Sequence, residues 1–160
     1  MKYLSTRGGE SGISFTSVLL NGLAKDGGLY VPESFPEFSA EDLKRLSHMS
    51  YPELCYEVTK GYISESDIPY KEYKKICFDT YDNKFGENII DIDKLSEYEN
   101  ILNLYHGPTL AFKDFALQLL GNIYDYILKK KRIELTILGA TSGDTGSAAI
   151  YGCSRSNNIK

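Results

Sequence analysis

The chain has 160 residues, of which 42% are hydrophobic and 25% are charged, and this composition is typical of a globular protein that buries a core. Its net charge of -4 gives no basic surface for nucleic acid. We see no signal peptide, no apolar run long enough for a membrane span and no cysteine pattern of a disulfide framework or metal site, and therefore expect a protein of the reducing cytoplasm without a bound metal.

The first expected elements lie within residues 1–95 and consist of turns, a short strand and modest helices. Residues 26–28 (Asp-Gly-Gly) form a turn signal. The next three residues, 29–31, are apolar or aromatic and predict a short strand that Pro32 should end.

Three helices are expected after this strand. A Ser-x-x-Asp pattern at residues 39–42 predicts a capped helix through Met49, and a Ser-x-x-Glu capping box at residues 50–53 predicts a second helix that ends at Gly61. A third helix should cover residues 69–83, with one apolar stripe made of Tyr70, Tyr73, Ile76, Cys77 and Thr80.

The pattern after residue 95 is strand, helix, strand, helix. Residues 101–105 predict a short strand, and Asp114 should cap the helix that follows, whose inward stripe is Ala116, Leu120, Ile123 and Ile127. Residues 134–139 predict a strand, with the continuous apolar run of parallel strands, and residues 141–152 predict a loop that enters a helix. This order predicts the opening of an α/β domain with a parallel sheet.

Lys113 stands between two phenylalanines in the stretch HGPTLAFKDFALQLLG, where an apolar helix is about to begin. A lysine in such a setting either snorkels from a buried segment or is present for its amine. Apolar neighbours and the positive end of a helix dipole both favour the neutral, nucleophilic form of an amine. On this residue alone both interpretations stay open.

The loop TSGDTG, residues 141–146, is the second candidate site. It follows a strand and opens a helix, and it offers hydroxyl groups, two glycines and helix N-terminal amides, which together favour anion binding. It lacks the lysine of a P-loop and does not match the GxGxxG pattern. The alternative is a polar loop capped by its own serine and threonine. A nucleophilic lysine beside an anion site is what a Schiff-base enzyme of phosphorylated aldehydes needs.

The segments HGPTLAFKDFALQLLG and ILGATSGDTGSAAI resemble signature segments of threonine synthases, pyridoxal-phosphate enzymes of the tryptophan-synthase-β-like fold. The opening segments YLSTRGG and GLAKDGGLYVPE are similar to the N-terminal region of that family. The resemblance implies an α/β protein with a small, mostly helical threonine synthase N-terminal region over residues 1–95. The start of a parallel-sheet, fold type II domain that binds pyridoxal phosphate would follow over residues 96–160.

The resemblance also implies roles for single residues. Lys113 matches the Schiff-base lysine, which holds the cofactor and transfers protons. Asp144 matches the position where related dehydratases and sulfhydrylases carry an asparagine that faces the cofactor's 3-hydroxyl. The segment that grips the substrate carboxylate is matched by Thr141, Ser142, Gly143 and Thr145. The implied reaction converts O-phospho-L-homoserine and water to L-threonine and phosphate, by a lyase that acts on a phosphate ester.

Threonine synthases are several hundred residues long, and their glycine-rich loop for the cofactor phosphate lies beyond the segments matched here. We therefore expect the chain to be the N-terminal part of such an enzyme and to be inactive alone. The whole enzyme could form an oligomer. Two alternatives stay open. One is a threonine-synthase-like phospho-lyase that acts on other phosphorylated hydroxy amino acids, and the other is a non-catalytic fragment.

Overall fold

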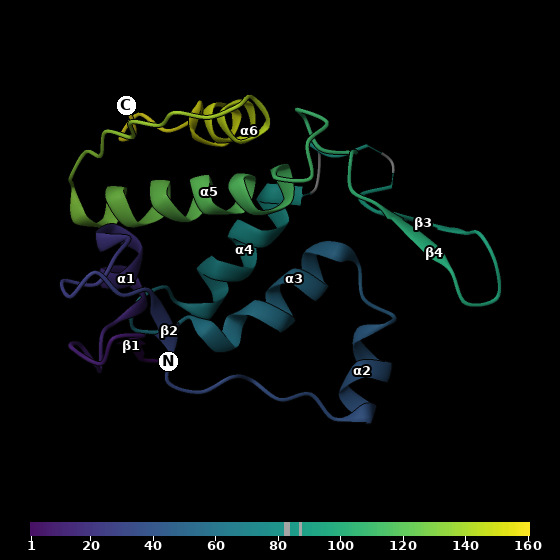
Figure 1. The fold of residues 1–160 in the computed structure, drawn as a ribbon, viewed down its shortest axis with the longest axis horizontal. Helices are drawn as coiled ribbons and strands as arrows, with labels where there is room; N and C mark the ends of the chain where they lie inside the picture. The colour runs from purple at the N-terminus through teal and green to yellow at the C-terminus, as the bar shows by residue number, and fades with distance from the viewer. Residues whose placement is uncertain (82–83, 87) are drawn as a thin grey trace. The chain divides into compact units, whose positions relative to one another are not determined.

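The structure is a computed structural model that describes residues 1–81, 84–86 and 88–160. Figure 1 shows the order of its helices and strands along the chain. The chain divides into two compact units, residues 1–75 and residues 76–160, and helix α4 (Tyr70–Tyr81) crosses the division. The expected domain division between residues 95 and 96 stays a prediction.

The N-terminal unit contains a small sheet of two antiparallel strands. Strand β1 (Tyr3–Ser5) pairs with β2 (Tyr30–Pro32), so the expected strand is present but lies one residue further along. Between them lies a short helix, α1 (Phe15–Asn21), which the sequence analysis did not predict.

The turn before β2 is held by the carboxylate of Asp26. This carboxylate accepts hydrogen bonds from Ser5 Oγ (2.7 Å), Gly9 N (2.8 Å) and Gly28 N (2.9 Å). A Cβ atom on Gly28 would overlap Ser5 Oγ, so the turn requires glycine at this position. The hydrogen bonds to Asp26 hold the pKa of its carboxyl below the ordinary value, the bond from Ser5 most of all.

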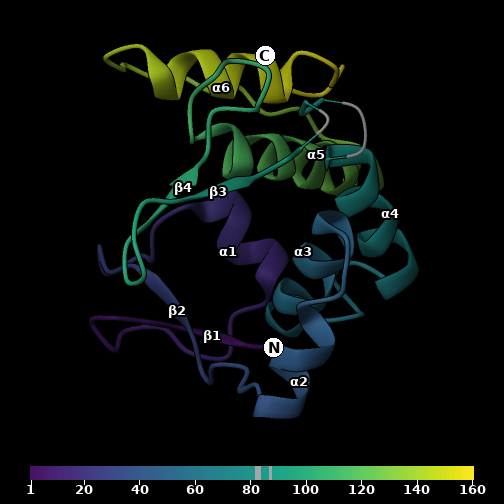
Figure 2. The ribbon, with the colours of Figure 1, turned by 90° about the vertical axis from the view of Figure 1, so that its right-hand side faces the viewer.

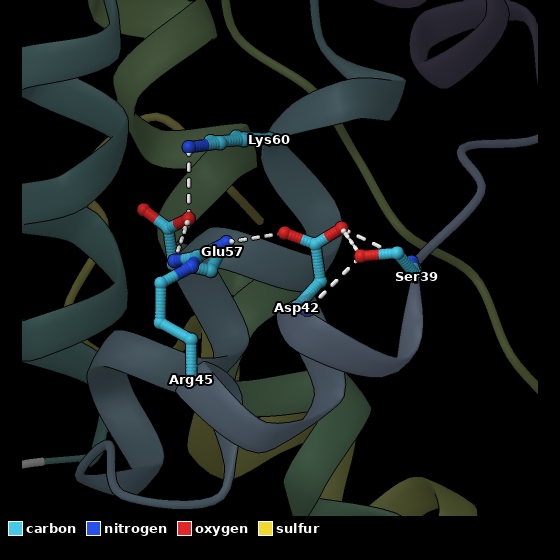
Figure 3. Close-up of polar contacts among 5 residues, drawn as sticks. All are labelled: Ser39, Asp42, Arg45, Glu57 and Lys60. Carbon is cyan, nitrogen blue, oxygen red and sulfur yellow. Dashed lines mark hydrogen bonds and ion pairs between the residues drawn. The ribbon is translucent and has the colours of Figure 1, made fainter.

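Both predicted capping boxes are confirmed, at the starts of α2 (Ala40–Leu46) and α3 (Tyr51–Thr59). Helix α2 is shorter than expected, and α3 continues into the 3-10 turn η1 (Lys60–Tyr62). Ion pairs connect the two helices, because Arg45 contacts both Asp42 (3.3 Å) and Glu57 (3.2 Å), and Glu57 also accepts from Lys60 (2.9 Å; Figure 3).

Helix α4 buries most of its predicted stripe: Tyr73, Ile76, Cys77 and Thr80 are buried. The prediction is wrong for Tyr70, whose side chain is exposed because it lies at the first residue of the helix. The expected end of this helix, at residue 83, lies outside the described residues.

After the end of α4, the second unit contains a hairpin of two antiparallel strands, β3 (Asp91–Lys94) and β4 (Asn100–Asn103). Strand β4 covers part of the predicted strand at 101–105, whereas β3 was not predicted. Two long helices follow, α5 (Asp114–Lys131) and α6 (Asp144–Cys153), which lie side by side (Figures 1 and 2).

The buried face of α5 differs in part from the predicted stripe. Ile123 and Ile127 are buried as expected, but Ala116 is exposed and Leu120 is only half-buried. Gln118 and Gly121 lie on the buried side instead, because that side contacts the backbone of α6. The apolar residues alone therefore pointed to a face that is rotated from the true one.

The expected strand at residues 134–139 is not formed as such. Only a single parallel bridge, Leu135 with Ile159, is present, with hydrogen bonds from Leu135 N to Asn158 O (2.8 Å) and from Lys160 N to Leu135 O (2.9 Å). A strand requires a paired neighbour, and in the described part of the chain residues 134–139 have one only along this short edge. Leu138 is accordingly 98% exposed.

The described residues therefore form a mixed helix-and-sheet structure with two small antiparallel sheets and one parallel bridge. None of the helices within the described ranges is long and apolar enough to cross a bilayer.

Candidate functional site

Lys113 lies at the end of a run of turns that leads into α5. Backbone hydrogen bonds join Leu110 N to Gly107 O (3.1 Å), Asp114 N to Ala111 O (3.0 Å) and Phe115 N to Phe112 O (3.3 Å). Leu110 has a φ of 63°, the left-handed conformation that a leucine rarely adopts. This conformation turns the chain just before Lys113 and is maintained against its own conformational cost by the surrounding hydrogen bonds.

Asp114 is the anchor of these turns. It is fully buried, and its Oδ2 accepts from Thr109 N (2.7 Å) and Thr109 Oγ1 (2.9 Å), while its Oδ1 accepts from Gln118 Nε2 (2.9 Å). The prediction that Asp114 caps α5 is therefore wrong: Lys113 occupies the N-cap position, and Asp114 is the first helical residue. Its carboxylate fixes the preceding turn instead of the first amides of the helix.

The side chain of Lys113 is half-buried, and its Nζ lies 4.3 Å from the centroid of the Phe112 ring. This is the distance of a cation–π contact. Lys113 forms no salt bridge with any residue that the structure describes, so no carboxylate there occupies the amine. The position fits a lysine whose amine is accessible for reaction.

The loop TSGDTG is shorter than expected, because α6 begins at Asp144 and takes Asp144 and Thr145 into its first turn. Gly143 is the N-cap and has a φ of 142°, which favours glycine. Thr141 Oγ1 accepts from Gly146 N (3.0 Å) and from Gly143 N (3.3 Å). The alternative interpretation of a loop capped by its own hydroxyl groups therefore holds for Thr141.

The first turn of α6 has amide groups that remain open. Of its first four N–H groups, Gly146 N binds Thr141 and Ser147 N binds the carbonyl of Gly143 (2.9 Å). Within the described ranges, the N–H groups of Asp144 and Thr145 have no hydrogen-bond partner, and neither have the hydroxyls of Ser142 and Thr145. Open amides at the positive end of a helix are suited to an anion.

Helices α5 and α6 bring Lys113 and this turn to the same end of the molecule's second unit. Gln118 contacts Ala148, and Gly121 contacts Gly152, so residue numbers rise together along the two helices and they run parallel. Lys113 lies five residues before Gln118, and Asp144 lies four residues before Ala148. At a rise of 1.5 Å per residue, each lies roughly 6–8 Å before the residue of its own helix that makes this contact, so both lie towards the N-terminal end of the helix pair.

Two further residues, which lie in the segments that resemble threonine synthases, have structural contacts. His106 Nε2 lies 2.8 Å from Asp91 Oδ2, at an ion-pair distance but outside hydrogen-bond geometry. Arg7 NH1 donates to the carbonyl oxygen of Asp26 (2.9 Å) in the N-terminal unit. Gln118 was missed altogether, because a glutamine within a helix gives no signal of burial in the sequence.

The fold and site thus define a mixed helix-and-sheet protein. Its Lys113, at the start of α5, lies at the same end of the helix pair as the open first turn of α6. The family description "Threonine synthase N terminus" matches residues 2–81, which is half of the chain. The chain therefore belongs to the threonine synthase family.

Individual relatives agree with this assignment. The chain is 47% identical over 159 residues to the threonine synthase of Pseudomonas aeruginosa, covering 99% of this chain and 34% of the relative. It is 44% identical to that of Schizosaccharomyces pombe, covering 95% and 31%. The crystal structure of PLP-bound threonine synthase from Brucella melitensis superposes with a TM-score of 0.94 at 40% identity, covering 100% and 34%. The chain thus spans about a third of the length of these relatives.

Proposed function

We propose that the protein to which this chain belongs is a threonine synthase, which converts O-phospho-L-homoserine and water to L-threonine and phosphate. The names of its relatives support this reaction. The observation that carries the proposal for these residues is the parallel pair α5/α6, which brings Lys113 and the open turn at residues 142–145 to one end.

The cofactor we propose is pyridoxal 5'-phosphate, which is bound in the threonine synthase structure from Brucella melitensis. When bound, it supplies an aldehyde that binds amines covalently and an electron-withdrawing ring. The residues of this chain fit such a group, because Lys113 offers a half-buried amine with no salt bridge in the described part of the chain. Asp144 offers a carboxylate, exposed in the first turn of α6, that can accept a hydrogen bond from the cofactor's 3-hydroxyl.

Lys113 would hold the cofactor through Nζ and, once released by the substrate's amine, would take up and return protons as a general base and acid. The buried Asp114 keeps the backbone of the turn fixed while the long lysine side chain moves. The amine can therefore swing between these tasks without displacing the turn.

The substrate carboxylate would bind at residues 141–145. The free N–H groups of Asp144 and Thr145 and the hydroxyls of Ser142 and Thr145 can donate to it, and Gly143 allows a close approach of the ligand to the backbone. Thr141 would contribute indirectly, since its oxygen already accepts from Gly143 N and Gly146 N and so shapes the turn.

We further propose that residues 134–139 and 158–160 are neighbouring strands of a parallel sheet, with α6 as the crossover between them. The bridge between Leu135 and Ile159 supports this arrangement. It would put residues 141–145 at the carboxyl end of a parallel strand, where open α/β sheets bind their ligands. The fold would then be of fold type II. We also propose that the protein acts on a small-molecule substrate in the cytoplasm, where its three cysteines would remain free thiols.

The test uses the whole protein loaded with pyridoxal phosphate. We expect phosphate release and threonine formation from O-phospho-L-homoserine, and we expect borohydride reduction to attach the cofactor to the peptide that contains Lys113. Phosphothreonine serves as the competing substrate. Faster phosphate release from phosphothreonine than from phosphohomoserine would replace the proposal with that of a phospho-lyase of other hydroxy amino acids.

A further inference from the structure

Helices α5 and α6 meet through glycine. A Cβ on Gly121 would overlap the carbonyl of Gly152, and a Cβ on Gly152 would lie 2.6 Å from the carbonyl oxygen of Leu117. The backbones are therefore in direct contact. Flat glycine surfaces have no side chains that interlock, so glycine contact alone does little to set how far one helix is shifted along the other.

Gln118 supplies a specific contact at this interface. It is fully buried, and its Nε2 donates both to Asp114 Oδ1 (2.9 Å) and to the carbonyl oxygen of Ala148 in α6 (3.2 Å). Both partners accept hydrogen bonds only, so the orientation of the amide follows from its surroundings. Since Ala148 is itself fully buried, water cannot easily take the place of either bond.

The hydrogen bonds continue from Gln118 to the turn that carries Lys113. Asp114, which accepts from Gln118, also binds the N–H and hydroxyl of Thr109. One chain of hydrogen bonds, buried from Asp114 onwards, therefore runs from Thr109 through Asp114 and Gln118 to Ala148. It connects the lysine turn to the helix whose first turn is open.

The amide of Gln118 satisfies two buried acceptors through Nε2 and, in the described part of the chain, leaves its own oxygen unpaired. Its Oε1 is buried and has no hydrogen-bond partner among the described residues. An unpaired buried acceptor is unfavourable and methionine would avoid it, but methionine would also leave Asp114 Oδ1 and the Ala148 carbonyl oxygen without the donor that Nε2 supplies. What the amide adds is a fixed position of α6 relative to Asp114.

We propose that Gln118 is a positioning residue, which sets the level of the first turn of α6 relative to Lys113. The inference rests on the proposed function, in which Lys113 and residues 142–145 act on one small molecule. A displacement of about 1 Å between reacting groups can lower a catalytic rate by about 100-fold. The contact at Ala148 lies one helical turn from Asp144, close enough to control such a displacement.

The first experiment compares Gln118→Met with wild type in the whole, cofactor-loaded enzyme. The control is Ser156→Ala, which removes the hydrogen bond of Ser156 to Asp125 (2.6 Å) towards the other end of the helix pair. We expect Gln118→Met to raise KM and lower kcat, with kcat/KM reduced by about 10- to 100-fold. Ser156→Ala should change kcat/KM by less than about 3-fold.

The second experiment measures hydrogen–deuterium exchange in the same proteins without cofactor. Gln118→Met should increase exchange at both residues 107–113 and residues 143–148, because one bridge supports both segments. Ser156→Ala should leave both unchanged. A variant with a lower Tm but with wild-type kcat, KM and exchange in these segments would overturn the proposal, as would faster exchange at only one of them.

The failure of the proposed function is distinguishable from the failure of this inference. If borohydride attaches the cofactor to a lysine other than Lys113, the proposed function is wrong whatever Gln118→Met does. If attachment is at Lys113 and Gln118→Met has normal kinetics and exchange, only the positioning role is wrong.

Discussion

Helices of residues 1–75 and helices of residues 76–160 begin in different ways. In α1 and α2 a serine caps the helix, since Ser14 Oγ accepts from Ser17 N (3.2 Å) and Ser39 Oγ accepts from Asp42 N (3.1 Å). In α5 and α6 the N-cap residues are Lys113 and Gly143, and neither caps its helix through a side chain. Helices α1 and α2 thus bind an N-terminal amide with the serine at the N-cap, whereas at α6 Thr141 binds Gly146 N, and the N–H groups of Asp144 and Thr145 have no partner in the described part of the chain.

The largest effect is expected at Lys113, the N-cap residue of α5, and it tests whether the amine of Lys113 takes part in catalysis. In the whole enzyme, Lys113→Ala should lower kcat by more than about 1,000-fold, because the variant loses the amine that we propose holds the cofactor and moves protons. The measurement is phosphate release from O-phospho-L-homoserine, together with the visible absorbance of the bound cofactor.

Lys129→Ala is the matched control for this variant. Lys129 lies in the last turn of the same helix and pairs with Asp125 (2.6 Å), far from the N-terminal end. It should retain wild-type activity. If Lys113→Ala also kept a borohydride-reducible cofactor, the reactive amine would be elsewhere and the contrast between capped and uncapped helices would lose its functional meaning.

The next effect concerns the open turn of α6. Ser142→Ala and Thr145→Ala should each raise KM by roughly 10- to 100-fold, since a hydrogen bond to a charged group contributes about 1.5–3 kcal/mol. Cofactor affinity and Tm should change little, because neither hydroxyl has a partner within the described ranges. Steady-state kinetics measure the change in KM, and a cofactor titration measures the change in cofactor affinity.

Two further variants serve as controls: Thr141→Ala should affect stability, and Ser147→Ala should affect neither stability nor binding. Thr141 caps the turn through Gly146 N, so its loss should lower the free energy of unfolding by about 0.5–2 kcal/mol. Ser147, in the same helix, should be neutral in both assays. A fall in cofactor affinity for Ser142→Ala at constant KM would show that residues 142–145 bind the cofactor and not the substrate carboxylate.

The sequence predicted the two regions unequally well. The capping boxes at Ser39 and Ser50 were correct because a box is read from residues three positions apart. Helix α1 was missed because it is short, and β3 was missed because it is polar at Asp91, Asp93 and Lys94 and depends on its pairing with β4. The hydrogen bonds of a capping box join residues close in sequence and can be predicted from them, whereas the pairing of two strands cannot.

The same reasoning applies to the candidate site. Lys113 and the TSGDTG loop stood out because lysine among phenylalanines, and clustered hydroxyls with glycine, are unusual in sequence. That Asp114 anchors the turn at Thr109, and that Gln118 joins α5 to α6, depends on tertiary packing with no spacing rule. The candidate residues could therefore be singled out from the sequence, whereas the contacts that hold them in place could not.

A smaller effect should come from the backbone contact that joins α5 and α6. Gly121→Ala should lower the free energy of unfolding by about 1–3 kcal/mol, because the added methyl overlaps the Gly152 carbonyl. Gly139→Ala is the control, as a Cβ there meets nothing within 4 Å. Thermal or chemical denaturation of the whole protein measures both. Equal stability of the two variants would mean that the helices separate readily, and that the second region is held together by other contacts.

The smallest effect lies in the self-satisfied N-terminal region, at Glu57. The hydrogen bond from Lys60, and next that from Arg45, hold the pKa of the Glu57 carboxyl below its ordinary value of 4.5. A carboxyl whose pKa is lower in the folded state stabilises the protein above the unfolded pKa, and this stabilisation is lost as the pH falls through the folded pKa. Because Arg45 and Lys60 are substantially exposed, solvent screens the pairs, and we expect less than about 1 kcal/mol.

Glu57→Gln should therefore be slightly less stable than wild type at pH 7, and this deficit should be smaller at pH 3, where a larger fraction of the wild-type carboxyl is protonated. Urea denaturation at both pH values measures the difference, and Glu37→Gln, at an exposed residue, should show none at either. A deficit that is the same at pH 3 as at pH 7 would arise from the shape or packing of the side chain and not from its charge. The ion pairs between α2 and α3 would then contribute no measurable stability to the first region.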